Sequence, residues 1–502
     1  MNVLAIDQGT SATKALLVGP GDEVLGRAEI PVTVRSTGEG GAETDPEELL
    51  ASVLAAGLEA VAGARADAVA LANQGETVLA WDRATGRPLS TAISWQDRRS
   101  AGICDRLAPS ASRLARITGL RLDPYFAAPK MTWLRENRTR EGVVTTTDSW
   151  LLARLGAGYV TDAATASRTL LLDLERAEWS ADACATFGAD PAELPAVVDC
   201  AAIAGETTAF GPGRALPIAG LAVDQQAALL AEHCLTAGEA KCTYGTGAFL
   251  LAVTGTRAVR SRGGLAASIA WRLSGQSTYC LDGQVYTAGA AIRWLRSLGL
   301  IESPADLDQG AAADAGGVTF VPSLAGLGAP HWRPDARGAF TGLGLAATRA
   351  HLIRAVIDGI AASVALLSRA MTADLGPPDG PDTRDRPATR DRPDTPDTPG
   401  AQGEPGAPLR TLRADGGLTR SRLLMQAQAD LLQVPVEICR TPDATALGVA
   451  ALARLGAGDV ADLASAVRPP QVEAVIEPSI TADQAAERNA AFASALSATL
   501  DL

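Results

Sequence analysis

Two turns in the sequence combine the residue types that bind phosphate groups. In the first, residues 3–18, an apolar strand ends near Asp7, and the turn Gly9-Thr10-Ser11 and Lys14 lead into a second apolar strand. Small residues let backbone N–H groups approach an anion closely, and hydroxyl groups add donors. Because Asp7 would repel a bare phosphate, its position indicates a Mg²⁺ ion between carboxylate and phosphate, bridged by water. An ordinary polar hairpin is the alternative for this segment taken alone.

A similar pattern recurs more than 200 residues later. Residues 241–253, KCTYGTGAFLLAV, place Gly245-Thr246-Gly247 between two apolar strands. Two such hairpins suggest two related halves whose turns face each other across a cleft and hold a polyphosphate from both sides. A third turn, Asp415-Gly416-Gly417, ends a strand and opens a helix, where the backbone can approach a nucleotide. The chain lacks G-x-G-x-x-G and G-x-x-x-x-G-K-[ST], so neither a Rossmann nor a P-loop site is expected.

The elements around these turns follow the rhythm of an α/β protein. Residues 351–371 predict a long amphipathic helix, residues 409–417 a strand, and residues 418–433 a helix with Thr419 as its N-cap. The apolar face of the first helix comprises Ile353, Val356, Ile357, Ile360, Val364, Leu367 and Met371. Between helix and strand, residues 376–408 are rich in Pro and Asp and predict a disordered surface loop.

Composition narrows the classes of function. The 502 residues contain 44 Lys+Arg and 57 Asp+Glu, a net charge of −13, which argues against nucleic-acid or anionic-membrane partners. The seven cysteines are odd in number and form no C-x-x-C pair, which favours buried thiols in a reducing compartment. No apolar run reaches 18 residues, and the N-terminus lacks a basic n-region, so we expect a cytoplasmic protein without membrane insertion. Only three cations are lysines: Lys14, Lys130 and Lys241.

At the level of motifs, the chain resembles the FGGY carbohydrate kinases, and within that family the glycerol kinases. The resemblance runs from about residue 2 to residue 456 and is interrupted only by the Pro/Asp-rich loop. It is carried by the stretches IDQGTSATKALLV, NQGETVLAWDRATGRPLSTAISWQDRR, DPYFAAPKMTWL, VDQQAALLAE, KCTYGTGAFLL, GQVYTAGAAIRWL, ADGGLTRSRLLMQAQADLL and TALGVAALA.

The resemblance implies an α/β fold with two RNase H-like domains of the actin/hexokinase type around a central cleft. Residues 1–234 would hold the acceptor site and the first phosphate turn, and residues 235–502 the second turn and the adenosine site. The implied reaction is ATP-dependent phosphorylation of a primary hydroxyl of a small polyol, with glycerol as the favoured acceptor. A homodimer or homotetramer would be typical of similar kinases.

The resemblance also implies roles for individual residues. Asp224, in the position of the Asp of a G-D-Q-Q motif, would be the general base, although Val223 replaces the glycine. Asp7 would hold Mg²⁺. The residues expected to bind ATP are Thr10, Ser11, Ala12, Lys14, Thr246, Gly289, Arg293, Gly417 and Ser421. Lys14, Arg293 and Ser421 stand where the family usually has Arg, Gln and Asn. The acceptor would contact Glu76, Tyr125, Asp224 and Gln225, with Trp95 and Phe249 as apolar walls.

One departure bears on the choice of acceptor. Residues 73–77 read N-Q-G-E-T, whereas glycerol kinases have N-Q-R-E-T, so Glu76 is kept and Gly75 replaces an arginine that binds a glycerol hydroxyl. Losing a charged donor costs about 1.5–3 kcal/mol, or roughly 10- to 150-fold in affinity. Glycine would also open space there. Either another residue restores the contact, or the pocket holds a longer polyol or ketose. A third reading is a catalytically weak, sugar-responsive binding protein.

Overall fold

The computed structural model describes residues 1–38, 40–211, 213–376, 409–441 and 443–501. Of the Pro/Asp-rich loop predicted over residues 376–408, all but Gly376 lies outside the described residues. Three aspects of the fold position the candidate site: two large sheets, two helices between them, and a smaller sheet beside the pocket.

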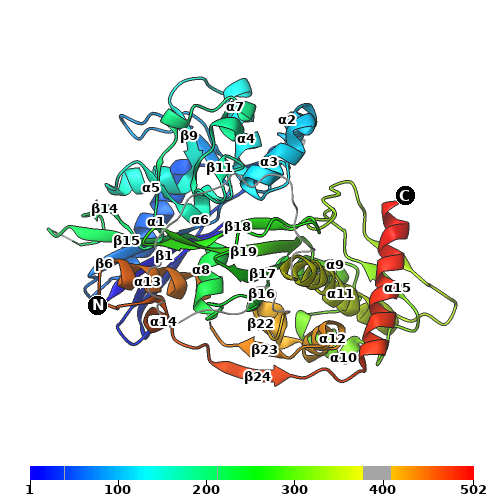
Figure 1. Ribbon diagram of the computed structural model, residues 1–502. Helices are drawn as coiled ribbons and strands as arrows, with labels where there is room; N and C mark the ends of the chain where they lie inside the picture. Colours follow the sequence, from blue (N-terminus) through cyan, green and yellow to red (C-terminus); the bar gives the residue numbers. More distant parts are fainter. Residues whose placement is uncertain (39, 212, 377–408, 442, 502) are drawn as a thin grey trace, which may run out of the picture.

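Two mixed sheets repeat one topology in the two halves of the chain (Figure 1). The first sheet has the order β14 (Ile203–Thr207), β15 (Leu216–Val223), β6 (Ala68–Asn73), β1 (Val3–Gln8), β2 (Ala12–Val18), β3 (Val24–Pro31). The second has the order β18 (Ala266–Leu273), β19 (Gln276–Val285), β17 (Ala248–Gly255), β16 (Ala240–Tyr244), β22 (Leu412–Asp415), β23 (Val436–Cys439), β24 (Val472–Ile476).

The two sheets share the same sequence of antiparallel and parallel strand pairs. In β3-β2-β1 and in β19-β17-β16 neighbouring strands are antiparallel, and β1-β6-β15 and β16-β22-β23 then continue as parallel strands. The two predicted phosphate hairpins are therefore equivalent: β1 and β2 form one, and β16 and β17 the other. This arrangement confirms the predicted α/β fold with two RNase H-like halves.

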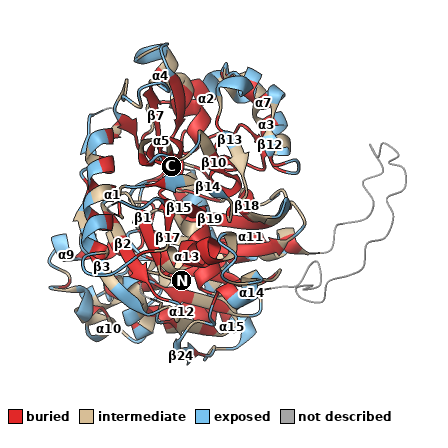
Figure 2. Ribbon diagram, turned by 90° about the vertical axis from the view of Figure 1, so that its left-hand side faces the viewer, coloured by how far each residue is buried: buried red, intermediate tan, exposed pale blue. Residues whose placement is uncertain are grey.

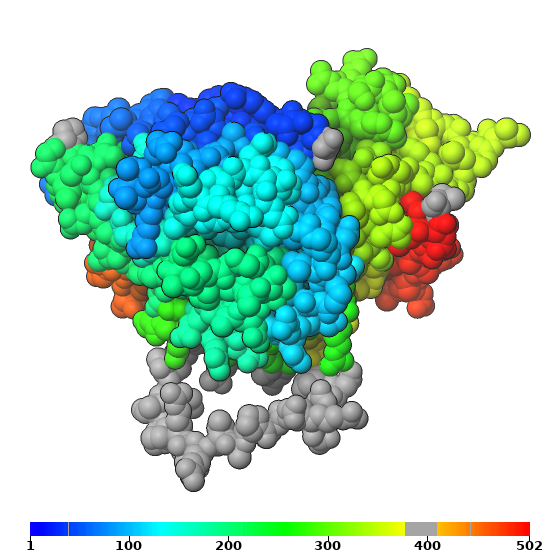
Figure 3. All heavy atoms as spheres, turned by 90° about the horizontal axis from the view of Figure 1, so that it is seen from above, coloured from blue at the N-terminus to red at the C-terminus, as the bar shows by residue number. Residues whose placement is uncertain are grey.

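Helices cover the sheets and separate them. They are α1 (Pro46–Ala60), α2 (Ala101–Leu107), α3 (Ala111–Thr118), α4 (Ala127–Asn137), α5 (Thr147–Leu155), α6 (Ala163–Ala166), α7 (Ala181–Phe187), α8 (Asp224–Ala231), α9 (Gly289–Ser297), α10 (Leu307–Gly310), α11 (Arg349–Leu375), α12 (Arg422–Leu432), α13 (Ala444–Gly456), α14 (Leu463–Ala466) and α15 (Ala482–Leu500). Viewed from above, the blue and cyan N-terminal residues gather on one side of the molecule and the red helix α15 lies at the other (Figure 3).

Helices α8 and α13 pack on each other, and α13 returns from the C-terminal half to cover β15, β6 and β1 (Figure 1). The approach is close because Gly448 has no side chain: a Cβ there would lie 1.9 Å from the carbonyl oxygen of Ala227. The predicted boundary after residue 234 falls in the connection between α8 and β16. The C-terminal half nevertheless supplies a helix to the first sheet.

Helix α11 confirms the predicted amphipathic helix. All seven residues of its predicted apolar face are buried, and the helix packs against β17 and β19. Its length and composition would also permit a membrane span, with a mean hydropathy of 1.7, but 67% of that stretch is buried inside the fold (Figure 2). Such burial is typical of a helix in the core of a folded domain.

A smaller sheet lies in the N-terminal half, with the order β4 (Arg35–Ser36), β5 (Ala42–Thr44), β8 (Ala92–Ile93), β7 (Val78–Trp81), β9 (Val143–Thr146). Three strand pairs complete the structure: β10 (Val160–Asp162) with β13 (Ala196–Val198), β11 (Leu172–Asp173) with β12 (Glu178–Trp179), and β20 (Thr319–Val321) with β21 (Ala339–Thr341). Short 3₁₀ turns are η1 (Ala108–Ser110), η2 (Pro191–Glu193), η3 (Pro304–Asp306) and η4 (Gly417–Arg420).

The predicted N-cap of the helix after β22 was wrong. Thr419 lies inside η4, and α12 begins only at Arg422, with Ser421 as its N-cap. Gly416 has φ +94°, which bends the chain sharply at the end of β22 and delays the helix. The sequence pattern of residues 418–433 could not separate the 3₁₀ turn from the helix that follows it.

Candidate active site

The residues predicted to contact an acceptor line one cavity of about 160 Å³ between the two halves. Its walls are Thr10, Gln74, Glu76, Trp95, Tyr125, Arg168, Val223, Asp224, Gln225, Gln226, Phe249 and Asp282. All six predicted acceptor contacts are among them. Phe249 and Asp282 come from β17 and β19, so the second sheet closes a pocket that is otherwise built by the N-terminal half.

Asp224 is the first residue of α8, directly after β15, and lines this pocket. The backbone N–H of Gln225 donates to its Oδ1 at 2.7 Å. The pKa of Asp224 is raised to about 7, first by burial and then by the neighbouring carboxylates of Asp7 and Glu76. The positive charge of Lys241 opposes this shift. A carboxylate with this pKa can accept a proton near neutral pH, as a general base must.

Asp7 lies near the end of β1, opposite Lys14 on β2. Burial raises the pKa of Asp7 to about 6, with Lys14 opposing the shift and Asp443 adding to it. The charge of Asp7 makes ionisation of Asp224 more costly, and a divalent cation bound at Asp7 would offset that effect. Among the described residues no cluster of three or more His, Cys, Asp or Glu could hold a metal. A site with the carboxylate of Asp7 as its protein ligand fits Mg²⁺, because Mg²⁺ usually binds one or two carboxylates together with phosphate and water.

The first phosphate turn is tied to the pocket wall. The Gly9 N–H donates to the Ala12 carbonyl at 3.1 Å, and the indole N–H of Trp95 donates to Thr10 Oγ1 at 2.9 Å. Ser11 is exposed at the tip of the turn. Lys14, predicted to bind phosphate, lies with its ammonium 3.8 Å from the carboxylate of Asp443, just before α13.

The second phosphate turn rests on the N-terminus of α9. The Thr246 carbonyl accepts hydrogen bonds from Ala288 and Ala290, and the Gly289 N–H donates to the Gly245 carbonyl at 3.0 Å. A Cβ on Gly289 would lie 2.5 Å from that oxygen, so only glycine fits there. The side chain of Thr246 is exposed beside the turn and free to contact a ligand.

The residues predicted for the adenosine end lie on different elements. Arg293 is exposed on α9, and Gly417 has open space around it at the start of η4. Ser421 is buried; its hydroxyl donates to Asp308 Oδ1 and accepts from the Leu424 N–H at 3.2 Å. The hydroxyl of Ser421 is therefore engaged in holding the start of α12.

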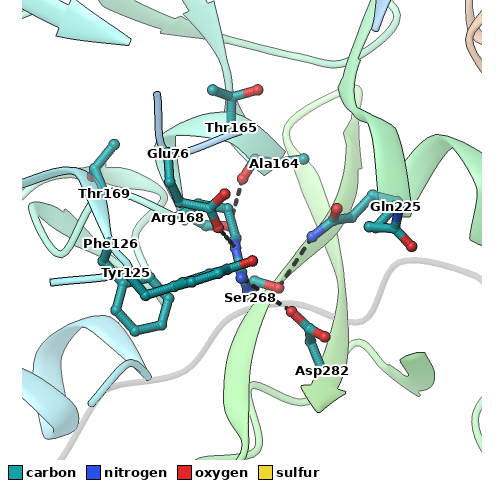
Figure 4. Close-up of polar contacts among 12 residues, drawn as sticks. Glu76, Tyr125, Phe126, Ala164, Thr165, Arg168, Thr169, Gln225, Ser268 and Asp282 are labelled. Atoms are coloured by element: carbon teal, nitrogen blue, oxygen red, sulfur yellow. Dashed lines mark hydrogen bonds and ion pairs between the residues drawn. The ribbon is translucent and has the colours of Figure 1, made fainter. Parts of the chain in front are cut away.

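Arg168 is a pocket residue that the sequence reasoning missed. Its Nε lies 2.6 Å from Glu76 Oε1 and its Nη2 lies 3.0 Å from Asp282 Oδ2 (Figure 4). Burial opposes the positive charge, but the two carboxylates raise the pKa of Arg168 above its ordinary value. One signal in the sequence could have indicated it: Arg168 stands just before the apolar run Leu170–Leu172. An arginine in a buried segment needs charged partners, and acidic residues elsewhere in the chain would then be expected beside it.

The turn that carries Glu76 has an uncommon backbone. Gly75 and Glu76 have φ of +57° and +47°, and the second value is costly for a residue with a side chain. The strain aims the Glu76 carboxylate at Arg168. Val223 occupies part of the space beside Gly75: a Cβ there would lie 3.3 Å from Val223 Cγ1.

Two of the three lysines are buried supports of the pocket. Lys130 donates to the carbonyls of Pro124, Tyr125 and Phe126 at 2.5–2.9 Å and so holds the loop that presents the Tyr125 ring. Lys241 donates to Gln225 Oε1 and to Thr243 Oγ1, both at 2.8 Å. Each ammonium satisfies several acceptors away from water, as a buried cation must.

Comparisons with known proteins agree with this architecture. The N-terminal domain of the FGGY family of carbohydrate kinases matches residues 2–231, and its C-terminal domain matches residues 240–457. A glycerol kinase of Thermus brockianus is 43% identical over 475 residues, covering 91% of this chain and 90% of the relative.

Solved structures show the same fold over nearly the whole chain. The glycerol kinase of Plasmodium falciparum with ADP has a TM-score of 0.87 at 28% identity and covers 99% of this chain and 98% of its own. A xyloylose kinase from Brucella ovis has a TM-score of 0.85 at 25% identity, covering 100% and 99%. With both family domains matched in order around a shared cleft, the chain belongs to the FGGY family of carbohydrate kinases.

Proposed function

We propose that the protein transfers the γ-phosphoryl group of ATP to a primary hydroxyl of glycerol, giving glycerol 3-phosphate, with Asp224 as the general base. The kinase class follows from the family. The observation that carries the proposal is Asp224, whose pKa of about 7 suits a base, in a small pocket with carboxylate, amide and guanidinium groups. The identity of 43% to a glycerol kinase supports glycerol as the acceptor.

The chain's own residues suffice to orient and deprotonate the acceptor. Asp224 accepts the proton of the attacking hydroxyl as that oxygen approaches the γ-phosphorus. Trp95 and Phe249 cover the carbon skeleton, while Glu76 and Gln225 offer hydrogen-bond partners to the other hydroxyls.

The phosphate side is proposed to work through the two turns. The hydroxyls of Thr10, Ser11 and Thr246 and the ammonium of Lys14 donate to phosphoryl oxygens and to charge that develops during transfer. Backbone around Ala12 completes the first turn. Mg²⁺, for which Asp7 is the proposed ligand, supplies charge neutralisation at the phosphates when bound.

The adenosine end is proposed to lie between α9 and the start of α12. Gly417 allows close approach of the nucleotide because it has no side chain, and Gly289 keeps α9 tight against the second turn. Arg293 is exposed on α9 and offers a donor. Ser421 contributes indirectly, by capping α12.

A coupled ADP-release assay tests the function. Purified protein with MgATP is screened against glycerol, erythritol, threitol, arabitol, xylulose and ribulose, and we expect the highest kcat/KM with glycerol. Higher kcat/KM with a four- or five-carbon acceptor would support the second candidate, a kinase for a longer polyol or ketose, which the missing arginine at Gly75 favours. Absence of turnover with all six would favour a sugar-responsive binding protein.

Assembly and location belong to the same proposal. A homodimer or homotetramer in the cytoplasm is expected, with neither nucleic acid nor membrane as a partner, in keeping with a net charge of −13. Light scattering coupled to gel filtration measures the assembly directly. A monomer at micromolar concentration would contradict the expected oligomer without touching the proposed reaction.

A further inference from the structure

Three buried polar atoms of pocket residues have no hydrogen-bond partner among the described residues: Gln226 Oε1 and two atoms that belong to one ion pair. One is Nη1 of Arg168, whose Nε and Nη2 are already engaged with Glu76 and Asp282. The other is Oδ1 of Asp282, whose Oδ2 accepts from Arg168 and from Gln284. Both residues line the cavity that holds Asp224. Buried donors and acceptors are rarely left unpaired in proteins, so ordered water or a bound ligand is expected to complete them.

The two atoms have complementary hydrogen-bonding roles. A guanidinium nitrogen can only donate, and an ionised carboxylate oxygen can only accept. A hydroxyl group accepts with its lone pairs and donates with its proton, so one hydroxyl can satisfy Arg168 and Asp282 together. An apolar ligand would leave both groups unpaired, which makes the pair selective for a hydroxyl.

We propose that Arg168 and Asp282 bind a non-reacting hydroxyl of the acceptor and so supply the charged donor that Gly75 cannot. The inference rests on the proposed function, because it assumes a polyol acceptor deprotonated by Asp224. It assigns the acceptor to the polyols, which carry a second hydroxyl besides the one that reacts. Neither residue was expected at the site from the sequence.

The guanidinium is held rigidly, as a specificity-determining group should be. Glu76 and Asp282 fix two of its nitrogens, and its carbon lies 5.7 Å from the centroid of the Tyr125 ring and 5.3 Å from that of Phe126 (Figure 4). The residue is almost completely buried. Because its geometry is set before the acceptor arrives, little conformational entropy is lost on binding.

The pair also joins the two halves of the molecule. Arg168 follows α6 in the N-terminal half, whereas Asp282 lies on β19 in the second sheet. Val223 lies against Gly75, with its Cγ1 3.3 Å from where a Cβ would stand, and takes up part of the room beside the glycine.

The test compares R168K and D282N with a matched control, R454K. Lysine at position 168 keeps a positive charge between the two carboxylates but cannot present three nitrogens, and asparagine at position 282 can place a donor where Oδ1 accepted. Arg454 is equally buried, paired with Asp22, and lies on α13 away from the pocket lining. Thermal melting of each variant establishes whether it is folded. If R168K does not fold, the kinetics of D282N alone decide the test.

Steady-state kinetics are measured with glycerol, propane-1,2-diol and propane-1,3-diol. We expect R168K and D282N to raise the KM for glycerol about 10- to 100-fold, with the KM for ATP within about 3-fold of wild type. With the diol that lacks the bound hydroxyl, the same substitutions should change KM by less than about 3-fold. R454K should leave all of these constants near the wild-type values.

Two results would overturn the inference: an unchanged KM for glycerol in both variants, or equal losses with glycerol and with both diols. The second result would mean that the residues only support the fold. Failure of the proposed function is distinct, because it appears in the wild-type protein as absent turnover of glycerol. If wild type prefers another polyol, the same variants are measured with that polyol and its deoxy analogues. An unchanged KM for that polyol, or equal losses with the polyol and all of its deoxy analogues, would then overturn the inference.

Discussion

Gly75 lies against Val223 of the pocket wall, although 147 residues separate them along the chain. A Cβ on Gly75 would lie 3.3 Å from Val223 Cγ1. Both positions depart from the motifs compared above, which have Arg at the first (N-Q-R-E-T of glycerol kinases) and Gly at the second (G-D-Q-Q). The side-chain volume lost at one position is therefore partly regained at the other, and the two departures form a single change in the wall.

Replacing Gly75 by alanine should destabilise the protein for two reasons. The residue has φ +57°, where a side chain costs about 1–2 kcal/mol, and the new methyl group would press on Val223. The control G188A has a similar φ of +69° but open space around its Cβ. Urea unfolding should therefore give a larger loss for G75A than for G188A.

The contact with Val223 can be isolated by a double-mutant cycle. Adding V223A to G75A should recover the part of the loss that exceeds the G188A value, since it removes the two methyl groups nearest the new Cβ. Equal losses for G75A and G188A, or strict additivity of G75A and V223A, would contradict direct packing between the two positions.

The proposed base makes activity and stability depend on pH in opposite ways. Because the pKa of Asp224 is raised to about 7, kcat/KM should fall tenfold per unit below that pH, and D224N should lose at least about 10²-fold in turnover while still binding ATP. Because the pKa of Asp224 is higher in the folded protein than in the unfolded chain, protonated Asp224 adds to the stability of the fold. This contribution is complete below about pH 4 and is lost as the pH rises through 7. At pH 8, D224N should therefore be more stable than wild type by about 2–4 kcal/mol in the free energy of unfolding and should melt at a higher temperature. At pH 4 the two proteins should have the same stability.

These outcomes are read from pH–rate profiles, calorimetric ATP binding and melting curves. Near-normal turnover of D224N would refute the base assignment. Loss of ATP binding together with turnover would instead indicate that Asp224 shapes the nucleotide site. Equal melting temperatures of D224N and wild type at pH 8 would contradict the cost of ionising this carboxyl group.

Lys241 should act on the acceptor through Gln225. In K241M the Gln225 side-chain oxygen loses its 2.8 Å donor, and we expect the KM for the acceptor to rise about 10-fold. Removing a cation near Asp224 also raises the pKa of Asp224, so the acid limb of the pH–rate profile should move to higher pH. K130M, which removes an equally buried lysine, should lower the melting temperature without moving that limb. A limb that moves equally in both variants would contradict the prediction.

Gly289 should matter for the nucleotide and not for the acceptor. A Cβ there would lie 2.5 Å from the Gly245 oxygen, so G289A must displace the second phosphate turn. We expect the KM for ATP to rise by at least about 10-fold with the KM for the acceptor nearly unchanged. G102A is the matched control in α2, where nothing lies within 4 Å, and it should leave both constants unchanged. A loss confined to thermal stability would show that the turn tolerates the shift.

Much of this protein is written in local patterns of the sequence. Alternating apolar runs and glycine turns predicted both phosphate hairpins, and the spacing of apolar residues predicted the helix over residues 351–371 with its buried face. The family motifs brought the six predicted acceptor contacts into one pocket. The hairpins and the helix depend on residues that are close in the chain, so a single segment contains the whole signal for each of them.

Tertiary structure alone decided the contacts between distant segments. Arg168 reaches Glu76 across 92 positions, and its second partner, Asp282, comes from the other half of the chain. The N-cap of α12 moved to Ser421, which Asp308 holds from another element. The reason is physical: a buried charge is stable only beside its partners, and their identity depends on how the two sheets pack, which no local pattern of residues records.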